Sequence, residues 1–192
     1  PLMLGGDWND GMNGVGKHGH GESVWLGWFL LRALNDFTPV ARERGDKKRA
    51  DAWTSHARQL KEALETHAWD GAWYRRGTFD DGSPLGSSQS DECRIDSIAQ
   101  SWAVLSGEAD PDRANQAIAS AVEHLVDDNL HIARLFTPPF EHTDRDPGYI
   151  KSYPPGVREN GGQYTHAATW LVIALAELGR ADDAWRVFSM LN

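Results

Sequence analysis

The sequence predicts an all-α protein, an α/α toroid in which three helix pairs form about half of an (α/α)6 barrel, with short β hairpins in the loops. Six helical segments alternate between segments that are apolar nearly all round and segments with one apolar stripe. Inner helices of a two-layer toroid are buried on both sides and outer helices on one, so this alternation is typical of that architecture. The alternative is an ordinary helical array.

The first pair covers residues 23–42 and 46–69. The first segment is apolar nearly all round, which predicts a buried helix. The second has Trp53, Ala57, Leu60 and Leu64 on one stripe, which predicts an amphipathic helix on the outside. A glycine-rich turn with a short strand is expected to follow.

The second pair begins with a mostly apolar helix over 96–105, in which Asp96 is expected to be the N-cap. Its partner begins at Asp110, because an N-cap residue is followed there by proline at the first helical position. The third pair covers the apolar segment 163–178 and the amphipathic segment 180–191.

Three long loops precede the three apolar helices. They cover residues 5–21, 83–94 and 144–162. In a toroid, the loops before the inner helices lie at the same end, so we expect all three to converge at one mouth. Long loops in compact domains are usually functional, and we expect the active residues there.

Composition excludes several classes of protein. The net charge of −9 argues against a nucleic-acid partner, which needs a basic face. No segment has the length and apolarity of a membrane span, and no signal peptide is recognisable. The single Cys93 excludes a disulfide framework and a cysteine-based zinc site.

Nine tryptophans are a high number for 192 residues. Indole faces stack on sugar rings, so an acidic, tryptophan-rich chain suits a carbohydrate-binding cleft. Four of the nine lie on helical apolar stripes, and we expect these to be core residues: Trp53, Trp102, Trp170 and Trp185.

The first loop contains the stretch GGDWNDGMN at residues 5–13. Two carboxylates, Asp7 and Asp10, flank Trp8 and Asn9, and glycines on both sides let the backbone approach a ligand. Carboxylates and amides bind sugar hydroxyls, whereas an indole stacks on the ring. The alternative is an Asx-rich turn whose side chains only cap local backbone.

The third loop ends in YPPGVRENGGQYTH at residues 153–166. It places Arg158, Glu159 and two tyrosines just before a buried helix, with His166 in the first turn of that helix. An imidazole near a helix N-terminus suits an anion such as phosphate. A lone histidine is more often a satisfied core residue, but its neighbours here favour a ligand.

His18 and His20 have the spacing of a short metal motif. No further ligands follow at suitable spacing, so we interpret both as loop residues and expect no metal site. Glu22, just before the first helix, is either a cap or a sugar ligand.

Four stretches together resemble glycoside hydrolase family 94, which contains cellobiose, cellodextrin and chitobiose phosphorylases. Within that family the chain is most similar to the phosphorylase-like C-terminal domain of cyclic β-1,2-glucan synthases and to β-1,2-oligoglucan phosphorylases. The resemblance covers essentially the whole chain. The stretches are GGDWNDGMN, GESVWLGWFL, RIDSIAQSWAV and YPPGVRENGGQYTH.

The resemblance implies an (α/α)6 barrel and a role for each matching residue. Asp10 matches the general acid, and Trp8 matches a contact to the sugar in subsite −1. Tyr153 and Arg158 match acceptor-site positions, and His166 matches a phosphate ligand. The expected substrate-binding set is Trp8, Asn9, Tyr153, Arg158, Glu159 and Gln163.

The resemblance also implies the reaction, in which phosphate attacks the anomeric carbon and α-glucose 1-phosphate is the product. An inverting phosphorylase needs only the acid, because phosphate replaces base and water. The implied partners are a β-glucan oligosaccharide and phosphate, without a metal or organic cofactor, nucleic acid or membrane contact.

We interpret residues 1–192 as one fragment, the C-terminal half of a catalytic barrel domain, because the chain lacks an initiator Met and ends at a helix end. The family's Thr-Gly phosphate pair and the Arg and Asp that hold the −1 sugar lie outside it. We therefore expect the isolated fragment to be nearly inactive and to form homo-oligomers through an exposed half-barrel face. The expected location is cytoplasmic, with a parent protein that is anchored in the inner membrane if it has membrane segments.

Two alternatives remain open at this point. An inverting hydrolase on the same barrel needs a second carboxylate as base, for which Glu159 is a candidate. A non-catalytic carbohydrate-binding module of a glucan synthase needs no acid at all. Dependence of turnover on phosphate distinguishes the phosphorylase from the hydrolase.

Overall fold

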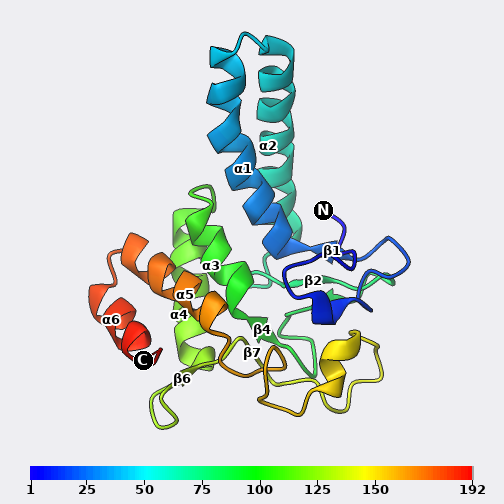
Figure 1. The fold of residues 1–192 in the computed structure, drawn as a ribbon, viewed down its shortest axis with the longest axis vertical. Helices are drawn as coiled ribbons and strands as arrows, with labels where there is room; N and C mark the ends of the chain where they lie inside the picture. Colours follow the sequence, from blue (N-terminus) through cyan, green and yellow to red (C-terminus); the bar gives the residue numbers. More distant parts are fainter. Residues whose placement is uncertain (192) are drawn as a thin grey trace.

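A computed structural model describes residues 1–191 and is mostly helical, with small antiparallel sheets (Figure 1). Two 3-10 helices, η1 (Asp10–Met12) and η2 (Tyr149–Ser152), lie in the first and third loops. The α-helices are α1 (Val24–Glu43), α2 (Lys47–His67), α3 (Ser97–Leu105), α4 (Pro111–Leu125), α5 (Thr165–Glu177) and α6 (Ala181–Ser189).

The sheets are small and lie where the loops enter and leave the helices. The strands pair antiparallel in the orders β1-β2-β3, β4-β7 and β5-β6. Their bounds are β1 (Glu22–Ser23), β2 (Gly77–Thr78), β3 (Pro84–Leu85), β4 (Ile95–Asp96), β5 (Val126–Asp127), β6 (Ile132–Ala133) and β7 (Phe136–Thr137).

Four predicted helix starts are confirmed by their caps. The side chains of Ser23, Asp46, Asp96 and Asp110 each accept a hydrogen bond from a backbone N–H in the first turn that follows. Such bonds satisfy N–H groups that have no partner within the helix. The helix expected from residue 163 begins at Thr165, without a side-chain cap.

The helices pack in the order that the alternation predicts. α3 lies between α1 and α5, and α2, α4 and α6 pack against α1, α3 and α5 respectively. Figure 1 shows α1 and α2 as a long hairpin that projects from the other four helices, with the loops gathered at the opposite end of α1. The long polar loops therefore share one end of the helix row.

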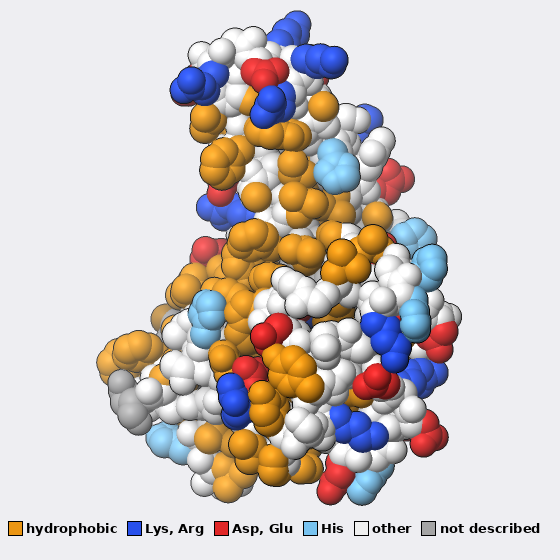
Figure 2. Space-filling model, turned by 45° about the vertical axis from the view of Figure 1, so that its right-hand side comes forward, with side chains coloured by type: hydrophobic (Ala, Val, Ile, Leu, Met, Phe, Trp, Pro, Cys, Tyr) orange, Lys and Arg blue, Asp and Glu red, His pale blue; other side chains and the backbone are white. Residues whose placement is uncertain are grey.

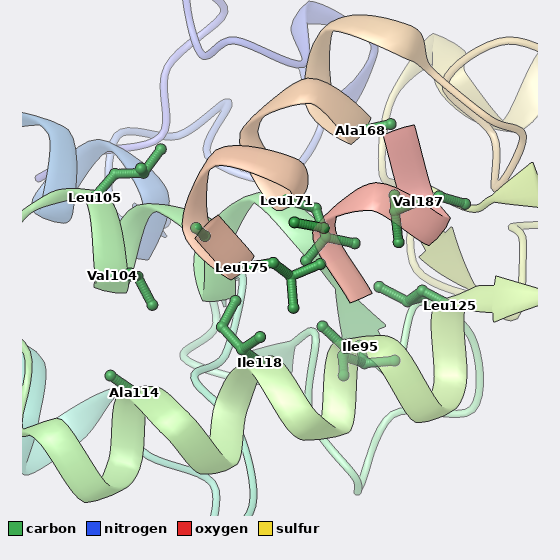
Figure 3. Close-up of a cluster of buried hydrophobic side chains, with 14 residues drawn as sticks. Ile95, Val104, Leu105, Ala114, Ile118, Leu125, Ala168, Leu171, Leu175 and Val187 are labelled. Atoms are coloured by element: carbon green, nitrogen blue, oxygen red, sulfur yellow. The ribbon is translucent and has the colours of Figure 1, made fainter. Parts of the chain in front are cut away.

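The largest apolar cluster joins α3, α4, α5 and α6 (Figure 3). Leu171 and Leu175 of α5 are fully buried against Ile118 and Leu125 of α4 and Val187 of α6. Burial of such a side chain stabilises the fold by about 1.5–3 kcal/mol. A second cluster packs α1 against α2, and a third lies beneath the loops.

Two expectations about burial are wrong. Trp185 is 70% exposed, although its position on an apolar stripe predicts a core residue. α1 is not buried all round, because Phe37, Phe29 and Val40 are 60%, 42% and 45% exposed. Within residues 1–191, these side chains are only partly covered, so an apolar pattern predicts more burial here than the described residues provide (Figure 2).

No helix in the described part of the chain combines the length and the hydropathy needed to cross a membrane.

Candidate active site

The first long loop contacts the third, and the second long loop contacts the segment that leads into the third. Gly14 N donates to Pro147 O (3.2 Å) and Tyr149 N donates to Asn13 Oδ1 (3.2 Å), which joins the first loop to the third. Glu92, in the second loop, accepts hydrogen bonds from the backbone N–H groups of residues 141–143, at 2.7 to 3.0 Å. The second loop thereby holds the chain that leads into the third.

Trp8 and His166 form a direct contact although 158 residues separate them. Trp8 Nε1 donates to His166 Nδ1 at 3.2 Å. The two rings also pack with Trp170 of α5, at centroid distances of 5.4 Å for Trp8 and 4.4 Å for His166. Tyr164 meets the Trp8 ring edge-on at 5.4 Å. This aromatic cluster unites the motif of the first loop with the motif of the third.

The hydrogen bond from Trp8 determines which nitrogen of His166 carries a proton. An indole N–H only donates, so His166 Nδ1 must be the acceptor and therefore unprotonated. In the neutral ring the proton then sits on Nε2. Because His166 is exposed, this Nε2–H group is available to donate to a ligand such as an anion.

Asp10 lies at the start of η1, with its carboxylate exposed. η1 packs against η2 of the third loop, and the Tyr149 side chain faces the carboxylate. The hydrogen bond to Asp10 is the main cause that raises the pKa of Tyr149 to about 12. Asp10 is therefore an accessible carboxylate with a protonated phenol beside it.

Tyr153, Arg158, Glu159 and Tyr164 form a polar group on the third loop. The Arg158 guanidinium lies over the Tyr153 ring, 4.8 Å from its centroid, and Arg158 Nε is 3.6 Å from Glu159 Oε2. The negative charge of Glu159 raises the pKa of Tyr164. Arg158 has a φ of +53°, a conformation that is uncommon for a residue other than glycine. Strained backbone of this kind is concentrated at ligand sites.

The structure does not bring every expected residue into this group. Both ends of the Gln163 amide serve the fold, since Oε1 accepts from Ala133 N (2.8 Å) and Nε2 donates to Met190 O (3.3 Å). Asn9 is buried, and neither of its amide atoms has a hydrogen-bond partner within residues 1–191.

His18 and His20 lie in the first loop. Their backbone N–H groups donate to the carboxylate of Asp80, 2.8 Å away in each case.

Two residues near the site were not found from the sequence. Tyr149 lies in a loop rich in glycine and proline, and no motif marks it. Arg76 is fully buried in an ion pair with Asp7, directly before Trp8. No sequence signal marks Arg76, which follows another arginine in the glycine-rich turn, and only the structure shows its partners.

Comparisons with known proteins show the family to which the chain belongs. The catalytic domain of the glycosyl hydrolase 94 superfamily matches residues 1–192. The chain is 62% identical over 192 residues to the cyclic beta-(1,2)-glucan synthase NdvB of Rhizobium meliloti (strain 1021). It is 37% identical over 188 residues to the 3-O-beta-D-glucopyranosyl-beta-D-glucuronide phosphorylase of Paenibacillus borealis. It is 35% identical over 189 residues to the N,N'-diacetylchitobiose phosphorylase of Vibrio proteolyticus.

The chain spans only part of each relative. All of it aligns with the glucan synthase, of which it covers 7%. It covers 24% of the glucuronide phosphorylase and 23% of the chitobiose phosphorylase, with 98% and 97% of its own residues aligned.

Proposed function

The chain belongs to the glycosyl hydrolase 94 superfamily, and we propose that it forms part of an inverting glycoside phosphorylase domain. This domain transfers a glucosyl unit between a β-glucan and phosphate and gives α-glucose 1-phosphate. The observation that carries the proposal is the hydrogen bond between Trp8 and His166, because it brings the segment that bears Asp10 beside an exposed imidazole.

Asp10 is the proposed general acid. Its carboxyl group donates a proton to the glycosidic oxygen while the bond from that oxygen to the anomeric carbon breaks. A phosphate oxygen forms the new bond to the same carbon from the opposite face, so the β-linked substrate gives an α-phosphate. Tyr149, protonated beside Asp10, is placed to donate a hydrogen bond to the carboxylate that remains after proton transfer.

His166 is the proposed phosphate ligand. It is the second residue of α5, where backbone N–H groups and the positive end of the helix dipole favour an anion. Trp8 holds Nδ1 as an acceptor, which directs the Nε2–H group to the phosphate. The absence of a required base distinguishes this chemistry from hydrolysis, because phosphate is itself the nucleophile.

Tyr153 and Arg158 are the proposed acceptor-site residues, and Glu159 lies beside them. Their hydroxyl, guanidinium and carboxylate groups suit the several hydroxyls of a second sugar. Similarity to a cyclic beta-(1,2)-glucan synthase makes a β-1,2-linked glucan the first substrate to assay. We also propose that the row of α1, α3 and α5 is one half of an (α/α)6 barrel, with no cofactor besides phosphate as co-substrate.

A hydrolase is the second candidate, because Glu159 provides another carboxylate near the site. Its Oε2 atom is buried and lies 3.6 Å from Arg158 Nε. This oxygen faces the guanidinium instead of open solvent where a water could be activated, which argues for a binding role.

Asp10→Asn, made in the native protein that carries this chain, tests the proposal. Phosphorolysis of a β-1,2-glucan should fall on the order of 10²–10⁴-fold, the range expected for loss of a general acid. β-Glucosyl fluoride, whose leaving group needs little protonation, should be affected much less. Asp144→Asn removes an exposed carboxylate from the third loop and serves as the control. An equal loss on both donors would show that Asp10 only binds sugar or supports the fold.

A further inference from the structure

Arg76 is a fully buried arginine at the edge of β2. Its guanidinium forms an ion pair with Asp7, which is also buried, and its Nε atom lies 3.4 Å from Asp96 Oδ2. Its Nη1 donates to Ser23 Oγ at 3.0 Å. One guanidinium thus contacts three residues from three separate parts of the chain.

Asp7 links this group to the candidate active site. Its carboxylate accepts from Ser23 Oγ (2.7 Å) and from the backbone N–H of Asn9 (3.1 Å), besides Arg76. Burial raises the pKa of Asp7, but the charge of Arg76 and these hydrogen bonds outweigh burial and hold it below its usual value. A buried carboxylate held from several directions fixes the backbone on both sides of Trp8, and Asp10 follows one residue after Asn9.

The same guanidinium is connected to the starts of two helices. Ser23 is the N-cap of α1 and accepts from Leu26 N at 3.2 Å. Asp96 is the N-cap of α3 and accepts from Ile98 N at 2.9 Å. Since α1 and α3 pack together, a displacement of Arg76 would move the first loop relative to both helices.

The backbone of Arg76 is fixed as well. Its N–H donates to Leu85 O (2.8 Å) and its carbonyl accepts from Val24 N (3.0 Å). Gly86 has a φ of +73°, and a Cβ there would lie 2.5 Å from Arg76 N. With its backbone held and its side chain fully buried, Arg76 has little freedom to shift, so the position of Asp7 depends on Arg76.

We propose that Arg76 is a positioning residue for the general acid. Through Asp7 it sets where the segment from Trp8 to Asp10 lies relative to α1 and α3, and it does not contact substrate itself. This inference rests on the proposed function, because it assigns the acid role to Asp10.

Arg76→Lys in the native protein tests the inference. A lysine keeps the charge but loses the planar fork that bonds Asp7 and Ser23 together. A misplacement of the acid by about 1 Å can cost on the order of 10²-fold in rate, so kcat on a β-1,2-glucan should fall roughly 10- to 100-fold. With β-glucosyl fluoride the loss should be under about threefold, because that donor needs little help from an acid.

Arg75→Lys is the matched control. Arg75 is the neighbouring residue, and its Nε lies 3.0 Å from the buried carboxylate of Asp70, outside the candidate site. Rates for each variant are divided by the folded fraction. Arg75→Lys should leave the ratio of the two donors at the wild-type value.

The outcomes separate the inference from the proposed function. Suppose that Asp10→Asn loses much more activity on the glucan than on β-glucosyl fluoride. If Arg76→Lys then loses activity equally on both donors, Arg76 is only structural and the inference is overturned. If Asp10→Asn itself loses activity equally on both donors, the proposed function fails, whatever Arg76→Lys shows. If Arg76→Lys does not fold, the neutral pair Asp7→Asn with Arg76→Gln replaces it. The inference expects the same unequal loss from that pair, and an equal loss would overturn it.

Discussion

Trp8 combines three roles at the residue scale. It packs in an aromatic cluster with Trp170, donates to His166 and, in the sequence, links Asp7 to the segment that bears Asp10. Only the indole N–H orients the imidazole, whereas the ring supplies the packing. The two contributions can be separated by one substitution.

Trp8→Phe keeps an aromatic ring but removes the donor to His166. A hydrogen bond contributes about 0.5–1.5 kcal/mol, so the KM for phosphate should rise roughly 2- to 10-fold. Without the indole donor, either nitrogen of the neutral His166 ring can carry the proton. The Nε2–H group is then present only part of the time, so phosphate binds more weakly and its KM rises. The measurement is phosphate saturation at a fixed glucan concentration, with Trp53→Phe on α2 as control. An unchanged KM for phosphate would show that the contact does not orient His166.

The sequence was informative for residues whose chemistry is carried by local motifs. Asp10, Trp8 and His166 stand in two stretches with dense functional groups, and the structure brings Trp8 and His166 into contact. Arg76 could not be found in this way. Its role depends on Asp7 and Asp96, which lie 69 residues before it and 20 residues after it, so only the folded arrangement reveals the pairing.

At the element scale, helix starts were predictable because caps are local. Asp96 and Asp110 each accept hydrogen bonds from residues two or three positions later, so the local sequence alone indicates these caps. The packing of η1 on η2 was not predictable, because it depends on contacts across more than 130 residues. The exposed face of α1 was mispredicted for a related reason, since an apolar pattern does not say which neighbour covers it.

Asp96 at the start of α3 gives a prediction about pH. Burial raises its pKa to about 6, despite the charge of Arg76, from about 3.9 in an unfolded chain. Between pH 4 and 6 the folded state therefore binds more protons than the unfolded state, and its stability falls as pH rises through this window. Above pH 6 this contribution no longer changes.

Asp96→Asn removes the titration while keeping an acceptor for the helix cap. The melting temperature of the wild type, relative to the variant, should therefore increase as pH is lowered from 7 to 4.5. Thermal unfolding of both proteins across that range provides the measurement. A difference that stays constant, or that shrinks towards low pH, would contradict a raised pKa for Asp96.

At the scale of the whole molecule, the row of α1, α3 and α5 leaves an apolar face uncovered by residues 1–191. A groove of about 450 Å³ between α1 and α5 is lined by Phe29, Phe37, Trp170 and Ile173 among others. Figure 2 shows apolar side chains running along the projecting hairpin and continuing below it. Large uncovered apolar patches mark surfaces that bind another protein surface.

Residues 1–192 produced alone should associate through this face and show almost no turnover. Phe37→Ser should weaken the association, because Phe37 is 60% exposed and adds apolar area without filling the core. The measurement is mass in solution as a function of concentration. Trp185→Ser, on α6 and away from the groove, is the comparison. A monomer at all concentrations would show that the face does not drive self-association.

The most direct test of the account uses the native protein and a β-1,2-glucan, with and without phosphate. Proton NMR of the first products distinguishes glucose from its phosphate and reads the anomer. The account predicts α-glucose 1-phosphate as the first product and almost no cleavage without phosphate. Release of free glucose at the same rate in both conditions, or a β-phosphate as the first product, would contradict an inverting phosphorylase.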